Sequence, residues 1–181
     1  ALTLIIIQGG IHRIAGAASV LVPVMAGGYL LAGLAVIAVH WQSVPAALGE
    51  MFSQALSPAA VAGGAAGTAL RWGVARGIFS NEAGMGSAAI TAASAGGSPA
   101  LQGCIHMTGV FFDTIVVCTV TGLAICCSGV LGTADSATGL PAEGAALIIL
   151  AFETVLGSAG RIFLAVSIVL FAFSSMLGWA Y

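Results

Sequence analysis

Residues 102–129 are the stretch that decides the fold class, and they read QGCIHMTGVFFDTIVVCTVTGLAICCSG. Asp113 is the one charged side chain among these 28 residues. A helix needs about 20 mostly apolar residues to cross a bilayer. The stretch therefore predicts a membrane-spanning helix, and with it an all-α integral membrane protein.

The composition of the whole chain agrees with a membrane environment. Charged residues make up 6% of the 181 residues and apolar residues 60%, whereas roughly 25% of a soluble domain is charged. So few charges exclude a soluble domain, a disordered chain and a nucleic-acid binder. The 26 glycines are typical of closely packed membrane helices, in which backbones approach each other.

The gaps between charged residues predict five spans. They are approximately residues 1–8 (partial), 19–39, 57–73, 102–129 and 162–181 (partial). Because the chain opens and closes inside apolar runs, we expect all 181 residues to be an internal fragment of one transmembrane domain.

The connections between the spans carry the remaining signals. We expect Gly9-Gly10 to end the first span, Ile11–Arg13 to form a short turn, and Pro23 to lie in the early turns of the second span. Residues from Val44-Pro45 to Leu56 have the spacing of a surface helix, and residues 142–156 predict a second amphipathic helix. Arginines fall in alternate connections, which places those connections on the cytoplasmic side of the membrane: Arg13, Arg71 and Arg76.

The third span contains a glycine-rich centre, Gly63, Gly64, Gly67 and Thr68. Each glycine costs a helix roughly 1 kcal/mol relative to alanine. The pattern has two interpretations that spacing alone does not separate. It is either an unwound hinge that lines a cavity, or a surface of small residues for close helix packing.

Asp113 is the clearest candidate for chemistry. A carboxylate inside a span costs about 2.5–3.5 kcal/mol and should face the protein interior with a partner. The expected partners are a cation, a proton, an arginine or hydroxyls such as those of Thr114 and Thr121. A structural, hydrogen-bonded aspartate is the alternative.

Two further groups are candidates. Ser174 and Ser175 carry adjacent hydroxyls that suit a hard cation such as sodium, although a serine in a membrane helix commonly bonds its own backbone. Arg76, Asn81 and Glu82 lie in a glycine-rich segment that we expect to be a cytoplasmic loop, where Asn81 or Glu82 caps a helix or pairs with Arg76.

The string RGIFSNEAGMGSA at residues 76–88 closely resembles the alanine or glycine:cation symporter family, also called sodium:alanine symporters. Three other segments resemble that family in the expected order: VPVMA with Tyr29, FDT with Cys118, Thr119 and Thr121, and FAFSS with GWAY at residues 171–181. The resemblance covers nearly the whole chain. Ala89 and Ser98 depart from the family pattern, which puts a proline and a histidine there.

The resemblance implies a LeuT-type inverted-repeat transporter, of which this chain is the end of helix 4 and helices 5 to 8. Span three then becomes broken helix 6, so Gly63, Gly64, Gly67 and Thr68 become substrate-binding candidates. Asp113, Thr114, Ser174 and Ser175 become cation-binding candidates, with sodium as the metal. The remaining helices of the full transporter are implied partners.

The expected function is secondary active symport of alanine or glycine with sodium across the cytoplasmic membrane. We expect a multi-pass protein with no enzymatic activity, no cofactor beyond the coupling sodium ion, and no nucleic-acid partner. Two alternatives remain open. One is a proton-coupled amino-acid transporter of the same fold, and the other is a non-transporting scaffold or a channel subunit.

Overall fold

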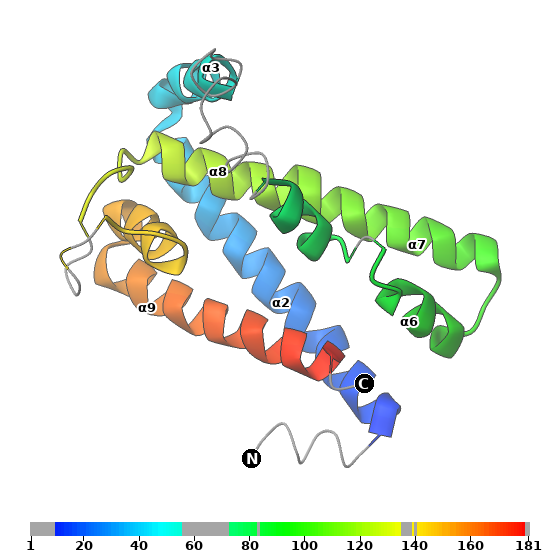
Figure 1. Cartoon of the computed structure of the whole chain (residues 1–181). Coiled ribbons are helices and arrows are strands. Elements are labelled where there is room, and N and C mark those ends of the chain that lie inside the picture. The colour runs from blue at the N-terminus through cyan, green and yellow to red at the C-terminus, as the bar shows by residue number, and fades with distance from the viewer. Residues whose placement is uncertain (1–9, 56–72, 83, 135–138, 140, 180–181) are drawn as a thin grey trace. The chain divides into compact units, whose positions relative to one another are not determined.

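The structure is a computed structural model that describes residues 10–55, 73–82, 84–134, 139 and 141–179 (Figure 1). These residues form helices and their connections, with an isolated bridge between Ala134 and Pro141. The expectation of an all-α protein is therefore confirmed for the part of the chain that the structure describes. The chain divides into two compact units: residues 1–44 with 123–181, and residues 45–122.

Three of the described helices are long and apolar enough to cross a membrane. They are Ala15–Val39, Pro99–Cys127 and Ala145–Met176, with mean hydropathies of 2.1 to 2.2. They overlap the spans expected at 19–39, 102–129 and 162–181. Residues 1–8 and nearly all of 57–73 lie outside the described residues.

Helix α2 (Gly10–Val39) begins earlier than expected. The expectation of a turn at Ile11–Arg13 was wrong, because these residues are helical. Pro23 therefore lies in the interior of the helix rather than in its early turns. An interior proline is tolerated in a membrane helix, because neighbouring groups and local adjustments satisfy the freed backbone group.

A short 3₁₀ turn η1 (Trp41–Ser43) leads into helix α3 (Val44–Ala55). Phe52 of α3 is exposed. Met51 of the same helix lies beside the C-terminal part of the helix Pro99–Cys127. Its Cε is 3.8 Å from the position that a Cβ added at Gly122 would take. The apolar residues of α3 thus divide between a protein contact and an outward surface, as in the surface helix that the sequence predicts.

Helix α9 (Ala145–Trp179) joins two elements that the sequence predicts as separate. The expected amphipathic helix (142–156) and the last span (162–181) meet at a kink, where Gly157 has φ 59° and ψ −150°. The Arg161 guanidinium lies 4.0 Å from the Glu153 carboxylate across this kink. Both side chains are partly exposed, so this pair is a weak constraint.

The first compact unit is built on the packing of α2 against α9 (Figure 1). Tyr29 of α2 stacks on Phe152, with ring centroids 5.5 Å apart, and meets the edge of Phe171 at 5.9 Å. A Cβ added at Gly28 would lie 3.3 Å from the Phe163 ring. Glycine at this position therefore lets the two helices approach closely.

The Gly157 kink gives a test of the fold. Replacing Gly157 with alanine should lower the free energy of unfolding by about 1–3 kcal/mol, because this backbone region is essentially restricted to glycine. Thermal unfolding of the full-length protein in detergent measures the effect. Gly27→Ala is the matched control, since a Cβ there meets nothing within 4 Å and alanine favours a helix. Unchanged stability of Gly157→Ala would contradict the kink.

Candidate cation and substrate site

An interrupted helix precedes the long membrane helix of the second unit. Residues 73–80 are helical, the described residues of 81–86 form turns, and helix α6 (Ser87–Ala95) follows. The backbone is left-handed at Glu82, Gly84 and Gly86, with φ values of 52°, 76° and 84°. Left-handed residues end a helix, and a glutamate in this conformation is uncommon. The interruption therefore follows from the sequence SNEAGMG at residues 80–86.

The long helix has its own irregularity at its centre. Helix α7 (Pro99–Phe111) passes into a π-helical turn, η2 (Phe112–Val117), and then into α8 (Cys118–Cys127). Ser98 caps the start of α7 by accepting a hydrogen bond from the Leu101 N–H at 3.2 Å. The Cys118 N–H donates to the Asp113 carbonyl, which is the wider spacing of a π-turn. Such turns are rare and often occur at functional sites.

Two side-chain hydrogen bonds connect the interrupted helix to the π-turn. The Ser80 hydroxyl donates to the Asp113 carboxylate, and the Thr114 hydroxyl donates to Asn81 Oδ1 at 2.8 Å. We call these four residues the central polar cluster: Ser80, Asn81, Asp113 and Thr114. The cluster joins residues that are 33 positions apart in the chain.

Asn81 also fixes the end of the first helical segment. Its Nδ2 donates to the Gly77 carbonyl at 3.1 Å, so Asn81 caps this helix, as the sequence predicts. The same bond turns the amide oxygen of Asn81 toward Thr114.

Glu82 bonds in the other direction along the chain. Its carboxylate accepts a hydrogen bond from the Ser87 hydroxyl, at the start of α6, where the N-cap residue Gly86 supplies no side-chain bond. A carboxylate is favourable at this positive end of a helix.

The central polar cluster lies at the middle of the long helix. Asp113 is half-buried and stands fourteen residues from each end of Pro99–Cys127. A carboxylate at this position needs a partner, and the Ser80 hydroxyl is the partner that the structure brings to it.

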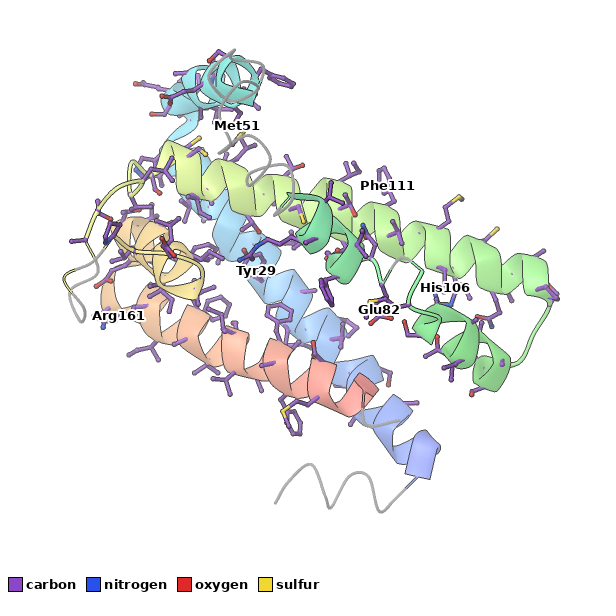
Figure 2. The ribbon with its side chains drawn as sticks, viewed as in Figure 1. Tyr29, Met51, Glu82, His106, Phe111 and Arg161 are labelled. Atoms are coloured by element: carbon purple, nitrogen blue, oxygen red, sulfur yellow. The ribbon has the colours of Figure 1, made fainter. Side chains whose placement is uncertain are left out.

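Two cavities flank the cluster, and both are lined by Ser80 and Asn81. One, of about 530 Å³, lies beside Arg76, Thr114 and Cys118. The other, of about 310 Å³, holds three ionisable side chains on its wall: Glu82, His106 and Asp113. In Figure 2, Glu82 and His106 lie near each other, Glu82 on the turn that follows residues 73–80 and His106 on α7. The polar groups of this unit thus face cavities rather than a packed apolar core.

The structure changes the expected surroundings of Asp113. Its described hydroxyl partner is Ser80, whereas the Thr114 hydroxyl donates to Asn81 and the Thr121 hydroxyl donates to the Val117 carbonyl at 2.7 Å. The physical reason is the direction of the interrupted helix, which ends with Ser80 facing Asp113.

The other expected site residues belong to other parts of the chain, and their roles stay predictions. Ser174 and Ser175 lie in the other compact unit. The Ser174 hydroxyl donates to the Phe171 carbonyl at 2.9 Å, and Ser175 is exposed. Gly63, Gly64, Gly67 and Thr68 lie outside the described residues, so the substrate wall expected there stays a prediction.

Ser80 is the residue that sequence reasoning missed. A signal was present in the sequence, because Ser80 opens the polar and glycine-rich string SNEAGMG at residues 80–86. The arginines at 71 and 76 favoured the interpretation of the segment as a cytoplasmic loop, which stays a prediction.

Comparison with known proteins decides the family. The sequence signature of the sodium:alanine symporter family matches residues 1–181. The chain belongs to the sodium:alanine symporter family. With three helices of spanning length, it is a multi-pass membrane protein, and the predicted resemblance is confirmed.

Individual relatives agree with this family. The chain is 44% identical to a sodium/alanine symporter of Methanococcus maripaludis, over 99% of this chain and 39% of that protein. It is 36% identical to a sodium/proton-dependent alanine carrier protein of a Bacillus species, over 97% of this chain and 41% of that protein. The chain is also 41% identical to an amino-acid carrier protein of Bacillus subtilis, over 99% of this chain and 37% of that protein. The chain thus spans about two fifths of the length of these relatives.

The bond between Asn81 and Thr114 gives a direct test of the cluster. A double-mutant cycle with Asn81→Ala and Thr114→Val in the full-length protein should yield a coupling free energy of at least about 0.5 kcal/mol. The loss of the Gly77 cap cancels in the cycle. The control pairs Asn81→Ala with Thr119→Val, on an exposed residue of the same helix, and should give no coupling. Equal coupling in both cycles would show that the two side chains do not meet.

Proposed function

We propose that this chain is the part of a sodium-coupled symporter for alanine or glycine in which the central polar cluster binds the cation. The observation that carries the proposal is the pair of hydrogen bonds from Ser80 to Asp113 and from Thr114 to Asn81. They gather oxygen atoms from two irregular helix segments at the middle of a 29-residue apolar helix.

The chemistry of the cluster suits sodium. It offers a carboxylate, two hydroxyls and an amide oxygen, and hard cations prefer oxygen ligands. A hydroxyl that now donates to its neighbour turns its proton away when a cation enters and offers a lone pair instead. The Asp113 carboxylate supplies the negative charge that offsets the cation in a low-dielectric environment.

The interrupted helix supports a LeuT-type arrangement, in which broken helices bind substrate and ions near the midplane. In this proposal residues 1–8 are the end of helix 4, α2 is helix 5, and residues 57–95 are helix 6. Helix 7 is then Pro99–Cys127, and helix 8 is the part of α9 after Gly157. The proposed break in helix 6 is the described one at residues 81–86. This places Asn81 and Glu82 at membrane depth rather than in a cytoplasmic loop.

The same arrangement suggests where the amino acid lies. The start of α6 points unbonded N–H groups away from the helix, and such ends attract carboxylates. We place the substrate at this helix start, with its carboxylate toward the N–H groups near Ser87 and its ammonium group toward the Glu82 carboxylate, which has the opposite charge. The substrate wall at Gly63, Gly64, Gly67 and Thr68 and a second cation position at Ser174 and Ser175 remain parts of the proposal.

Sodium and substrate then reinforce each other's binding. The cation neutralises Asp113, which makes the neighbouring site less repulsive to a substrate carboxylate. The inward sodium gradient supplies the free energy that concentrates the amino acid. The rest of the transporter, which lies beyond these 181 residues, completes both sites.

A proton-coupled transporter of the same fold is the second candidate. The Bacillus relative named as a sodium/proton-dependent alanine carrier protein favours this alternative. In it Asp113 would carry the proton instead of binding sodium. Uptake of labelled alanine into vesicles with an imposed sodium gradient or an imposed proton gradient separates the two.

Replacing Asp113 with asparagine should raise the sodium concentration needed for half-maximal alanine uptake at least tenfold. The substitution keeps the shape but removes the charge, and a loss of about 1.4 kcal/mol in cation binding is tenfold in affinity. The measurement is uptake by the full-length transporter as a function of sodium concentration, normalised to the amount of protein in the membrane.

Thr119→Val is the control on the same helix and should leave the sodium dependence unchanged. A purely structural Asp113 would lower the yield of Asp113→Asn protein and leave the sodium dependence of the surviving transporters as in the parent. That result would defeat the cation role.

A further inference from the structure

A third cavity continues from the smaller cavity of the central polar cluster. It has a volume of about 630 Å³ and lies between α6 and α7. Ala88 and His106 line both this cavity and the smaller one. The two cavities are therefore neighbours along α7, and His106 stands where they meet. We call the pair together the α6–α7 passage.

The walls of the passage are made of small side chains. Helix α6 contributes alanines at positions 88, 89, 92 and 93, and α7 contributes Gly103. Glycines 103 and 109 on the α7 side face open space, because a Cβ added at either would meet nothing within 4 Å. The two helices run side by side (Figure 1), and the larger of the two cavities is lined mainly by alanine and glycine.

Polar side chains occur along the whole length of the passage. Asp113 and Glu82 lie at the cluster end, His106 lies between the cavities, and Gln102 lies at the far end. There the Gln102 side chain donates to the Gly96 carbonyl at 2.6 Å, which ties α7 to the turn at residues 96–98. The carboxylates of Glu82 and Asp113 line the smaller cavity, and negative charge on a cavity wall favours a cation over an anion.

We propose that the α6–α7 passage is a water-filled route by which the cation travels between the central polar cluster and the turn at residues 96–98. This inference rests on the proposed function, since it assigns a path to the ion that the cluster binds. His106 lines the junction of the two cavities, and the bond from Gln102 to Gly96 holds the far end of the route together.

The ionisable side chains favour water in this space over lipid. Glu82, His106 and Asp113 share one wall within or beside a membrane-spanning helix. Ionisable groups at such depth face a water-filled cavity or a protein partner, because exposure to hydrocarbon is costly. The larger cavity, lined mainly by alanine and glycine, would bind an ion only weakly, which lets the ion leave.

Thiol accessibility tests the passage. The full-length protein is placed in lipid nanodiscs, where both membrane faces meet the buffer, and is treated with a positively charged methanethiosulfonate that reacts only in water. Gly103→Cys places a thiol on the passage wall. Met107→Cys is the matched control, because Met107 is 68% exposed on the same helix and lines neither cavity.

Peptide mass spectrometry measures the extent of labelling at each cysteine separately. The native cysteines therefore do not have to be replaced. Cys104, exposed on α7 and lining neither cavity, is an internal reference. We expect Gly103→Cys to react at least tenfold faster than Met107→Cys and Cys104. Ala92→Cys, on the opposite wall, is a second variant with the same expectation.

Three outcomes decide the proposal. Fast reaction at both wall positions and slow reaction at the controls supports a water-filled passage. Slow reaction at every position overturns it, since the space is then filled by lipid or by another helix. Fast reaction at every position also overturns it, because the water is then not confined to the passage.

The test separates this inference from the proposed function. Sodium-driven alanine uptake by the parent protein is measured alongside the labelling. Slow labelling with normal uptake removes the passage and leaves the symporter proposal intact. Absent uptake with fast wall labelling removes the symporter proposal and leaves a water-filled space.

Discussion

The carboxylate of Asp113, halfway along an apolar helix, is the constraint on which the second unit depends. A charge at that position costs several kcal/mol unless protein or water compensates it. Ser80 reaches it from a helix that stops at that residue, and Asn81 bonds the neighbouring Thr114. The interruption at residues 81–86 and the π-turn at Phe112–Val117 are the backbone changes that allow these contacts.

Irregular backbone is costly in a membrane, because bilayer hydrocarbon offers no hydrogen-bond partners. Two irregular segments that face each other therefore carry information about function. Helices of a purely structural pair would remain regular and pack through small residues, as α2 and α9 do at Gly28. The second unit instead keeps cavities on both sides of its polar cluster. A site that must admit and release an ion has this need for space, whereas a packed core does not.

Sequence reasoning predicted much of this arrangement. Hydropathy identified α2, the Pro99–Cys127 helix and α9, because an apolar run between charges has few structural alternatives in a bilayer. It also singled out Asp113, and the family resemblance was confirmed. It failed at Ile11–Arg13, where glycines suggested a turn, and at Gly157, where a kink rather than a loop joins two helices.

The site itself was predicted only in part. Asp113 and Thr114 were predicted as cation-binding residues, which stays a prediction, and the hydrogen bond from Ser80 to Asp113 depends on a contact across 33 residues. No local pattern carries such a contact. The spacing of apolar residues does not predict the π-turn either, because one extra residue in a helical turn barely changes the pattern of an almost wholly apolar segment. The arginines at 71 and 76 favoured a cytoplasmic loop, whereas the proposed arrangement makes the segment part of a broken helix, and charge counts do not distinguish the two.

Sodium binding to a Ser80→Ala variant tests the central claim most directly, because Ser80 enters the account through the structure alone. Calorimetric titration of the purified full-length protein with sodium compares this variant with the parent and with Ser94→Ala, an exposed serine on α6 that bonds its own backbone. The account predicts an affinity about tenfold lower for Ser80→Ala, which corresponds to about 1.4 kcal/mol, and no change for Ser94→Ala. Equal sodium affinity in a folded Ser80→Ala protein would contradict a cation site at the central polar cluster.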